Sequence, residues 1–114
     1  MNIERNGIYL ANLDPVIGHE IAKTRPVVIV SNDANNRFSG TVSVLPVTST
    51  NLKKIYPFEV LLKKGIGNLP KNSKVKADQI RTLDKRRIVK HIGGLSEKEM
   101  NPINEALIIH LSLK

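Results

Sequence analysis

Apolar residues in the first three-quarters of the chain form short runs that Gly, Pro, Asn and Asp interrupt. Short runs rich in β-branched residues and bounded by such residues are typical of strands joined by turns. Residues 26–30 are apolar without alternation, so we expect that strand to be buried on both faces. The pattern predicts strands at residues 7–13, 26–30, 41–48, 55–63 and 73–83, a short basic strand or turn at 85–92, a polar loop at 16–24 and a turn at 31–36.

The only helix that the pattern predicts lies at the C-terminal end of the chain. Apolar residues recur there at helical spacing, at Met100, Ile103, Leu107 and Leu111. Two starts fit. Ser96 and Glu99 form a capping-box pair, but Pro102 then falls inside the helix, where it removes a hydrogen bond. We favour a helix over residues 101–113 with Pro102 in its first position, preceded by a separate helical turn.

The predicted elements define a mainly β fold with one C-terminal helix. Several short strands with Gly and Pro turns favour a small barrel or a strongly curved antiparallel sheet. The chain has 114 residues, of which 40% are hydrophobic, enough for one core. We therefore expect a single domain over residues 1–114.

Composition excludes several kinds of chemistry. The chain has no cysteine, which removes disulfides, thiolate metal sites and cysteine nucleophiles. His19, His91 and His110 lack the spacing of metal ligands, so we expect no metal site. No apolar run approaches the roughly 20 residues that a membrane span needs, and the first residues lack an apolar signal region. We expect a cytoplasmic protein that does not contact the membrane.

The positive charge of the chain is concentrated in one part of the sequence. The formal net charge is +8, and between Lys53 and Lys90 there are twelve basic and three acidic residues. Such a stretch is either a solvated surface or a face that binds a polyanion. Because the aromatic residues are few, we expect phosphate contacts to dominate the affinity for a nucleic acid.

Five short motifs occur in order along the chain: Asp14-Pro15 with Gly18-His19-Glu20, Lys23-Thr24-Arg25-Pro26-Val27, Asn32-Asp33 with Asn36-Arg37, Pro46-Val47-Thr48-Ser49, and Asp78-Gln79-Ile80-Arg81-Thr82-Leu83-Asp84. Together they resemble the MazF/PemK (Kid) toxins of bacterial type II toxin–antitoxin systems. The resemblance covers nearly the whole chain. It implies an SH3-like barrel that acts as a homodimer and cleaves single-stranded RNA, such as mRNA, within short sequence motifs without a metal or a cofactor.

The resemblance also implies catalytic residues. The principal pair of the family corresponds to Arg25 and Thr48, and the PemK branch adds His19 and Asp78. Lys76 stands where that branch has an arginine, and Asn6-Gly7 also departs from the family pattern.

These residue types suit metal-free RNA cleavage, in which the ribose 2′-OH attacks the neighbouring phosphorus. A guanidinium matches phosphate oxygens and stays charged. A threonine hydroxyl donates to developing charge, and an imidazole or a carboxylate transfers protons. Gln79 and Arg81 either bind RNA or position strands. The residues that we expect to contact RNA are Lys23, Thr24, Ser49, Lys53, Lys54, Lys76, Gln79 and Arg81.

Three functions remain open at this point. The first is an RNA-cleaving toxin inhibited by a cognate antitoxin, a small protein with an acidic flexible tail, with DNA bound only through the toxin–antitoxin complex. The second is a gyrase poison like the CcdB toxins, which use a C-terminal Trp; this chain has no Trp. The third is a barrel that binds RNA without cutting it.

Overall fold

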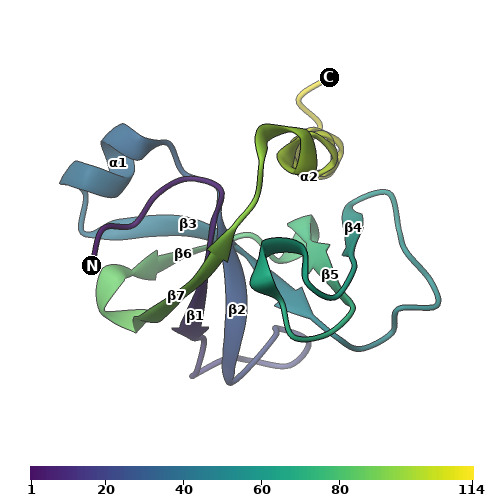
Figure 1. Ribbon diagram of the computed structural model, residues 1–114, viewed down its shortest axis with the longest axis horizontal. Helices are drawn as coiled ribbons and strands as arrows, with labels where there is room; N and C mark the ends of the chain where they lie inside the picture. Colours follow the sequence, from purple (N-terminus) through teal and green to yellow (C-terminus); the bar gives the residue numbers. More distant parts are fainter.

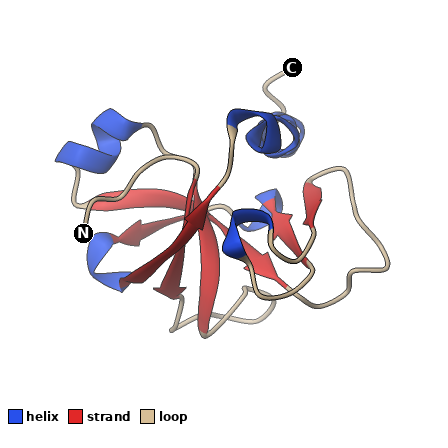
Figure 2. Cartoon of the chain, in the orientation of Figure 1, coloured by secondary structure: helices blue, strands red, loops and turns tan.

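A computed structural model describes all residues 1–114. Seven strands form one antiparallel sheet, with two α-helices and three short 3₁₀ turns around it (Figures 1 and 2). The strands are β1 (Gly7–Asn12), β2 (Thr24–Ile29), β3 (Thr41–Thr48), β4 (Glu59–Leu62), β5 (Ser73–Lys76), β6 (Arg81–Asp84) and β7 (Ile88–Gly94). The helices are α1 (Asp33–Phe38) and α2 (Glu97–Leu111), and the 3₁₀ turns are η1 (Ile66–Asn68), η2 (Ala77–Gln79) and η3 (Lys85–Arg87).

The sheet is strongly curved around β3. Its strand order is β4-β5-β3-β2-β1-β7, and β6 pairs with β3 as well. The first half of β3 pairs with β6, with Val44 opposite Arg81, while its end pairs with β5, with Thr48 opposite Lys74. The hydrogen-bonded path ends at β4 and β7. Of the two predicted forms, the pairings therefore give the curved antiparallel sheet, and they do not close it into a barrel.

The prediction of one strand over residues 73–83 is wrong. The segment is β5, then η2, then β6, because it must pair with two different parts of β3. At the break the N–H of Ala77 donates to the backbone oxygen of Phe58, and the N–H of Ile80 donates back to Ala77. The resulting turn carries Asp78 and Gln79 at one end of the sheet. Residues 85–92 contain both predicted forms, a turn (η3) and then the start of β7.

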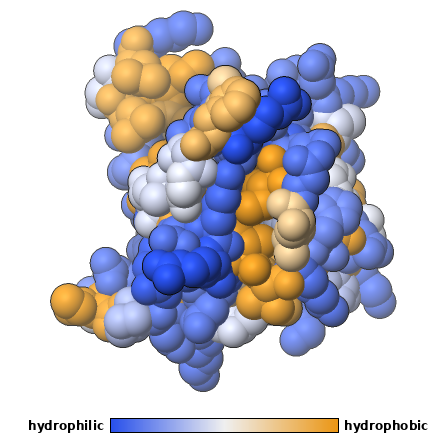
Figure 3. All heavy atoms as spheres, turned by 90° about the vertical axis from the view of Figure 1, so that its left-hand side faces the viewer, coloured by the Kyte–Doolittle hydropathy of each residue, from blue (hydrophilic) through white to orange (hydrophobic).

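The two central strands are buried on both faces, as predicted for residues 26–30. Val28 belongs to one apolar cluster with Leu45 of β3, and its neighbour Val27 belongs to a second cluster with Val44. Helix α2 adds Met100, Ile103 and Ala106 to the first cluster. Apolar atoms also reach the surface, where they form separate groups among hydrophilic ones on the face shown in Figure 3. None of the helices combines the length and the apolar composition that a transmembrane segment requires.

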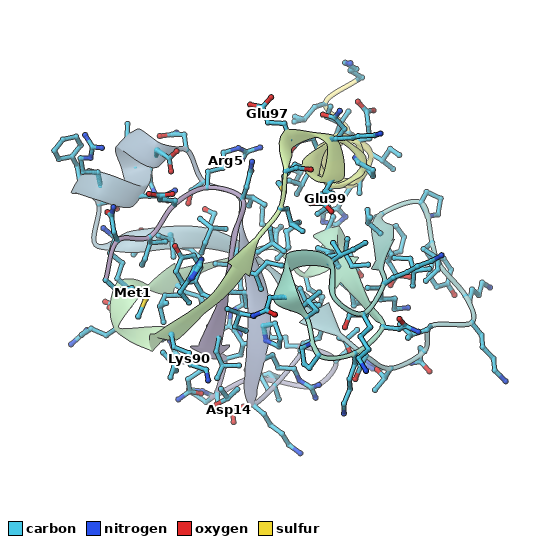
Figure 4. All side chains as sticks on the ribbon, in the orientation of Figure 1. Met1, Arg5, Asp14, Lys90, Glu97 and Glu99 are labelled. Atoms are coloured by element: carbon cyan, nitrogen blue, oxygen red, sulfur yellow. The ribbon has the colours of Figure 1, made fainter.

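Helix α2 begins at the capping box, so the favoured start at Asn101 is wrong. Ser96 accepts a hydrogen bond from the N–H of Glu99 at 3.1 Å, and the Glu99 carboxylate accepts one from the N–H of Ser96 at 2.8 Å. The acidic side chains of the first turn are labelled in Figure 4. Pro102 lies inside the helix. It deprives the carbonyl of Lys98 of its partner, but Lys98 is exposed to water. Two capping hydrogen bonds therefore outweigh one lost bond.

Helix α1 was not predicted, because its Asn-rich sequence is typical of turns. Its asparagines serve as caps instead of breaking the helix. The side chain of Asn32 accepts a hydrogen bond from the N–H of Asn35 at 2.8 Å. Asn36 is buried and donates to the backbone oxygen of Ser31 at 2.9 Å. The strand predicted over residues 55–63 is also shorter than expected, since only Glu59–Leu62 pairs with β5.

Candidate active site

A hollow of about 390 Å³ lies at the end of β3, between the loop that follows β1 and the turn η2. Three of the four predicted catalytic residues line it: His19, Thr48 and Asp78. Lys76 and Gln79, both predicted to contact RNA, line it too. Residues from three separate parts of the chain therefore meet at one opening.

Thr48 is the last residue of β3, and its hydroxyl contacts the chain that follows. Thr48 is only 7% exposed. Its Oγ1 lies 3.0 Å from the Oγ1 of Thr50 and accepts a hydrogen bond from the N–H of Thr50 at 3.3 Å. The next residue, Ser49, is exposed. The hydroxyl thus has a fixed position at the edge of the hollow.

Arg25 does not line this hollow but lies at the same end of the sheet. Its side chain borders a neighbouring hollow of about 180 Å³ together with Ser49. Its Nε donates to the backbone oxygen of Ala22 at 3.0 Å. Val27 of β2 lies opposite Pro46 of β3, and continuing this register by two residues places Arg25 level with Thr48. No hydrogen bond joins the two side chains.

Asp78 has a carboxylate oxygen that is buried and unpartnered. Its Oδ1 makes no hydrogen bond and lies 4.0 Å from the Nζ of Lys76. That ammonium is engaged elsewhere, 2.8 Å from the Oε2 of Glu59. A buried oxygen without a donor is unusual in a folded protein, because the desolvation of the group is not compensated. The Asp78 side chain as a whole is 28% exposed and borders the hollow.

The loop that carries His19 is held in place by Gln79. The amide of Gln79 donates to the backbone oxygen of His19 at 3.2 Å and accepts from the N–H of Ile21 at 3.2 Å. Arg81 acts similarly, since its Nη1 donates to the backbone oxygen of Leu13 at 3.0 Å. Both side chains position strands and loops, one of the two roles predicted for them. The imidazole of His19 itself is exposed.

The base of the same loop is closed by Asp14, which is labelled in Figure 4. Its Oδ1 accepts a hydrogen bond from the N–H of Lys23 at 2.9 Å, and the N–H of Leu13 donates to the backbone oxygen of Lys23 at 2.8 Å. Lys23 has a left-handed backbone with φ 70°. Lys23 and Thr24 are both exposed where β2 begins. The loop is therefore tied at its base by Asp14 and near its tip by Gln79.

The sequence did not reveal a buried ion network beside the site. The side chain of Glu59 is fully buried and that of Lys74 is 4% exposed. Glu59 Oε1 lies 3.0 Å from the Nζ of Lys74, which also donates to the backbone oxygens of Asn51 and Lys54. Burial alone would raise the pKa of Glu59, but hydrogen bonds from Lys76, the N–H of Tyr56 and Lys74 lower it overall. A single acidic residue within the run of lysines was the only signal in the sequence.

The largest hollow, about 660 Å³, lies on the other side of this network. Its lining includes Ser49, Lys53, Lys54 and Tyr56, and it shares Lys76 with the hollow at Thr48. Basic side chains therefore border the whole end of the sheet. No group of three or more His, Cys, Asp or Glu side chains is placed to hold a metal ion.

The fold and these hollows define a class of protein. It is a small domain with a curved β-sheet and one long helix, and the basic residues at one end of the sheet suit the binding of a polyanion. Residues 4–111 match the family described as PemK-like, MazF-like toxin of type II toxin-antitoxin system. The chain therefore belongs to this toxin family, as its motifs indicated.

Individual relatives agree with this assignment. Endoribonuclease MazF of Staphylococcus saprophyticus is 41% identical over 111 residues, which are 97% of this chain and 92% of the relative. The crystal structure of MazF from Deinococcus radiodurans has a TM-score of 0.84 at 29% identity, covering 98% of both chains. An endoribonuclease solved in complex with its cognate antitoxin, from a mycobacterial species, has a TM-score of 0.80 at 29% identity, covering 98% of this chain and 97% of its own.

Proposed function

We propose that this chain, as a single toxin domain of residues 1–114, is an endoribonuclease that cuts single-stranded RNA, including mRNA, at short sequence motifs. The observation that carries the proposal is the meeting of Thr48, His19 and Asp78 around one hollow, with Arg25 level with Thr48 on the neighbouring strand. The family to which the chain belongs and its endoribonuclease relative support the same activity.

The reaction that suits these groups is attack of the ribose 2′-oxygen on the adjacent phosphorus. A bond forms between the 2′-oxygen and phosphorus, and the bond from phosphorus to the 5′-oxygen breaks, which leaves a cyclic phosphate and a free 5′-hydroxyl. The 2′-proton goes to a base and the 5′-oxygen receives one from an acid. No metal or cofactor enters this scheme.

Each group of the site has a role in this scheme. The carboxylate of Asp78, whose side chain is 28% exposed, is the candidate for the base, and the exposed imidazole of His19 is the candidate for the acid. Arg25 compensates the charge that builds on the phosphate oxygens. The hydroxyl of Thr48 donates a hydrogen bond to the same charge.

The basic residues around the site hold the RNA backbone in this proposal. Lys53 and Lys54 border the largest hollow and form no ion pair. Lys23 and Thr24 lie exposed where β2 begins. Because such contacts release counterions from RNA, binding weakens steeply as the salt concentration rises.

We propose three partners besides RNA. The first is a cognate antitoxin, a small protein whose acidic flexible tail occupies the cationic end of the sheet, in keeping with the antitoxin complex of the mycobacterial relative. The second is a second copy of the chain, because Ile109, Leu111 and Leu113 leave apolar surface exposed along and beyond the end of α2. The third is DNA, bound only through the toxin–antitoxin complex. All of these partners are cytoplasmic, and we place the protein there.

Cleavage of a long single-stranded RNA in the presence of EDTA tests the proposal. The wild type should cut at a few defined positions, which primer extension maps. Arg25→Ala and Thr48→Ala should each lower the rate at least a hundredfold, the size of effect seen when one donor to a developing charge is removed. Both variants should keep the wild-type urea midpoint. Full activity in both would refute the assignment of this pair, and RNA binding without products would favour the non-catalytic alternative.

A further inference from the structure

Tyr56 is an aromatic residue that packs on Phe58 and remains partly exposed to solvent. Its N–H donates to the buried Oε1 of Glu59 at 3.0 Å, which anchors the backbone. Its ring stacks on Phe58 with centroids 5.4 Å apart and planes 4° from parallel. Phe58 packs in turn against the core cluster and lies 6.4 Å from the ring of His110 on α2. Tyr56 as a residue is nevertheless 43% exposed.

Tyr56 borders the hollow of about 660 Å³. A volume of this size accommodates a nucleotide. Lys53 and Lys54 lie on the same lining and have no acidic partner. The Nζ of Lys54 lies over the Tyr56 ring, 4.9 Å from its centroid. The hollow therefore combines an aromatic face with two uncompensated cations.

This combination matches one unit of single-stranded RNA, a flat base next to a charged phosphate. Proteins that bind single strands use aromatic faces for bases and a positive groove for the backbone. Stacking of a base on an aromatic ring gains more than an exposed ammonium does over the same ring. A base can therefore displace Lys54 from the ring, and the displaced ammonium can reach the neighbouring phosphate.

We propose that Tyr56 is a stacking platform for one unpaired base of the RNA, with Lys53 and Lys54 binding the phosphates beside that base. The hollow shares Lys76 with the one at Thr48, so the platform lies within a few nucleotides of the cleaved bond. Stacking accepts any base, so the platform raises affinity and sets the register of the strand at the site. This inference rests on the proposed endoribonuclease function and adds a binding subsite to it.

The test is a double-mutant cycle between the ring and individual bases. A short RNA that spans a mapped cut carries a 2′-methoxy group at the cleaved nucleotide, so it binds without being cut. A set of such RNAs each lacks the base at one position. Dissociation constants are measured by fluorescence anisotropy for the wild type, Tyr56→Ala and Tyr56→Phe. Phe38→Leu is the matched control, because Phe38 is an exposed aromatic on α1, which is far from β4 and β5 in Figure 1.

At one position, loss of the base should weaken binding to the wild type and to Tyr56→Phe roughly tenfold, as expected for one lost stacking contact. The same loss should change binding to Tyr56→Ala less than about twofold, because the partner ring is already gone. Phe38→Leu should behave as the wild type at every position. A urea midpoint for Tyr56→Ala close to that of the wild type shows that the fold is intact.

The inference is overturned if, at every position, loss of the base weakens binding to Tyr56→Ala as much as it weakens binding to the wild type. It is also overturned if Tyr56→Ala binds the intact RNA as tightly as the wild type does. Cutting of the unmodified RNA by the wild type is followed in parallel. If the RNA is cut but no position couples to Tyr56, only the stacking platform is refuted. If the wild type neither binds nor cuts RNA, the proposed function fails as well.

Discussion

Among substitutions that keep the size of the side chain, Glu59→Gln should lower the stability of the protein the most. Glu59→Gln keeps the size of the side chain and removes its charge. In the wild type the carboxylate compensates Lys74 at 3.0 Å and Lys76 at 2.8 Å, with the Glu59 side chain fully buried. In the variant, Lys74 remains at 4% exposure with only backbone oxygens and a neutral amide as partners.

Removing one member of a buried ion pair costs about 3–5 kcal/mol, mainly because the remaining charge is desolvated without compensation. For 114 residues the entropy of unfolding is about 0.24 kcal/mol/K, so the melting temperature should fall by roughly 12–20 °C. Lys76 is 21% exposed and can turn toward water or Asp78. Most of the cost should therefore come from Lys74.

Urea unfolding of the variants at one fixed protein concentration measures this effect, and the fixed concentration removes any contribution from association. Glu105→Gln is the control, since Glu105 is exposed on α2, and its free energy of unfolding should change by less than about 0.5 kcal/mol. Adding Lys74→Met to Glu59→Gln should restore part of the stability, because it removes the stranded charge. A loss below about 1 kcal/mol for Glu59→Gln would refute this reasoning.

Three further predictions concern the loop, the helix and acid stability. Gln79→Ala should speed hydrogen exchange at the amide of Ile21 and slow RNA cleavage, because both hydrogen bonds from Gln79 to the His19 loop are lost; unchanged exchange would show that other contacts hold this part of the loop. Ser96→Ala should lower the free energy of unfolding by about 1 kcal/mol, measured by urea, through loss of the cap. The lowered pKa of Glu59 contributes stability above its usual value of 4.5, and this stability should disappear as the pH falls through the folded pKa; NMR titration of the Glu59 carboxyl checks the direction.

The strands at the centre of the sheet were predictable because their pattern is local. Residues 26–30 read as doubly buried, and β3 occupies the predicted residues 41–48, with Val28 and Leu45 in one core cluster and Val27 and Val44 in the other. The alternation of polar and apolar residues within a strand does not determine which other strand pairs with it. The break at η2 was missed because the alternation of residues 74–79 continues from β5 through Ala77–Gln79, the residues that form the turn.

The helices show the limits of single-residue rules. Pro102 disfavours a helix that starts at Ser96, because it removes one hydrogen bond. The capping box of Ser96 and Glu99 supplies two hydrogen bonds, which more than compensate for that loss. Likewise Asn32 and Asn36 read as turn formers, while in α1 they cap the first turn and fill a buried polar position. Residue types that are typical of turns can therefore also cap a helix or lie within it.

The candidate site was predictable by residue type but not by arrangement. The motifs pointed to Thr48, His19 and Asp78, which meet around one hollow, and to Arg25, which borders the next one. The ion network of Glu59 with Lys74 and Lys76 depends on the register of β4 against β5, in which Glu59 lies opposite Lys76. The charge pattern shows one acidic residue among lysines, but it does not show which lysines that register brings next to Glu59.

The chemistry of the cut is the most direct test of the proposed function. A single 2′-deoxy nucleotide is placed on the 5′ side of a mapped cut, and cleavage by the wild type is followed in EDTA with mass spectrometry of the products. Attack by the 2′-oxygen predicts no cutting at the deoxy position and, on the unmodified RNA, fragments that end in a 2′,3′-cyclic phosphate and begin with a 5′-hydroxyl. Cutting at the deoxy position, or fragments that begin with a 5′-phosphate, would contradict it.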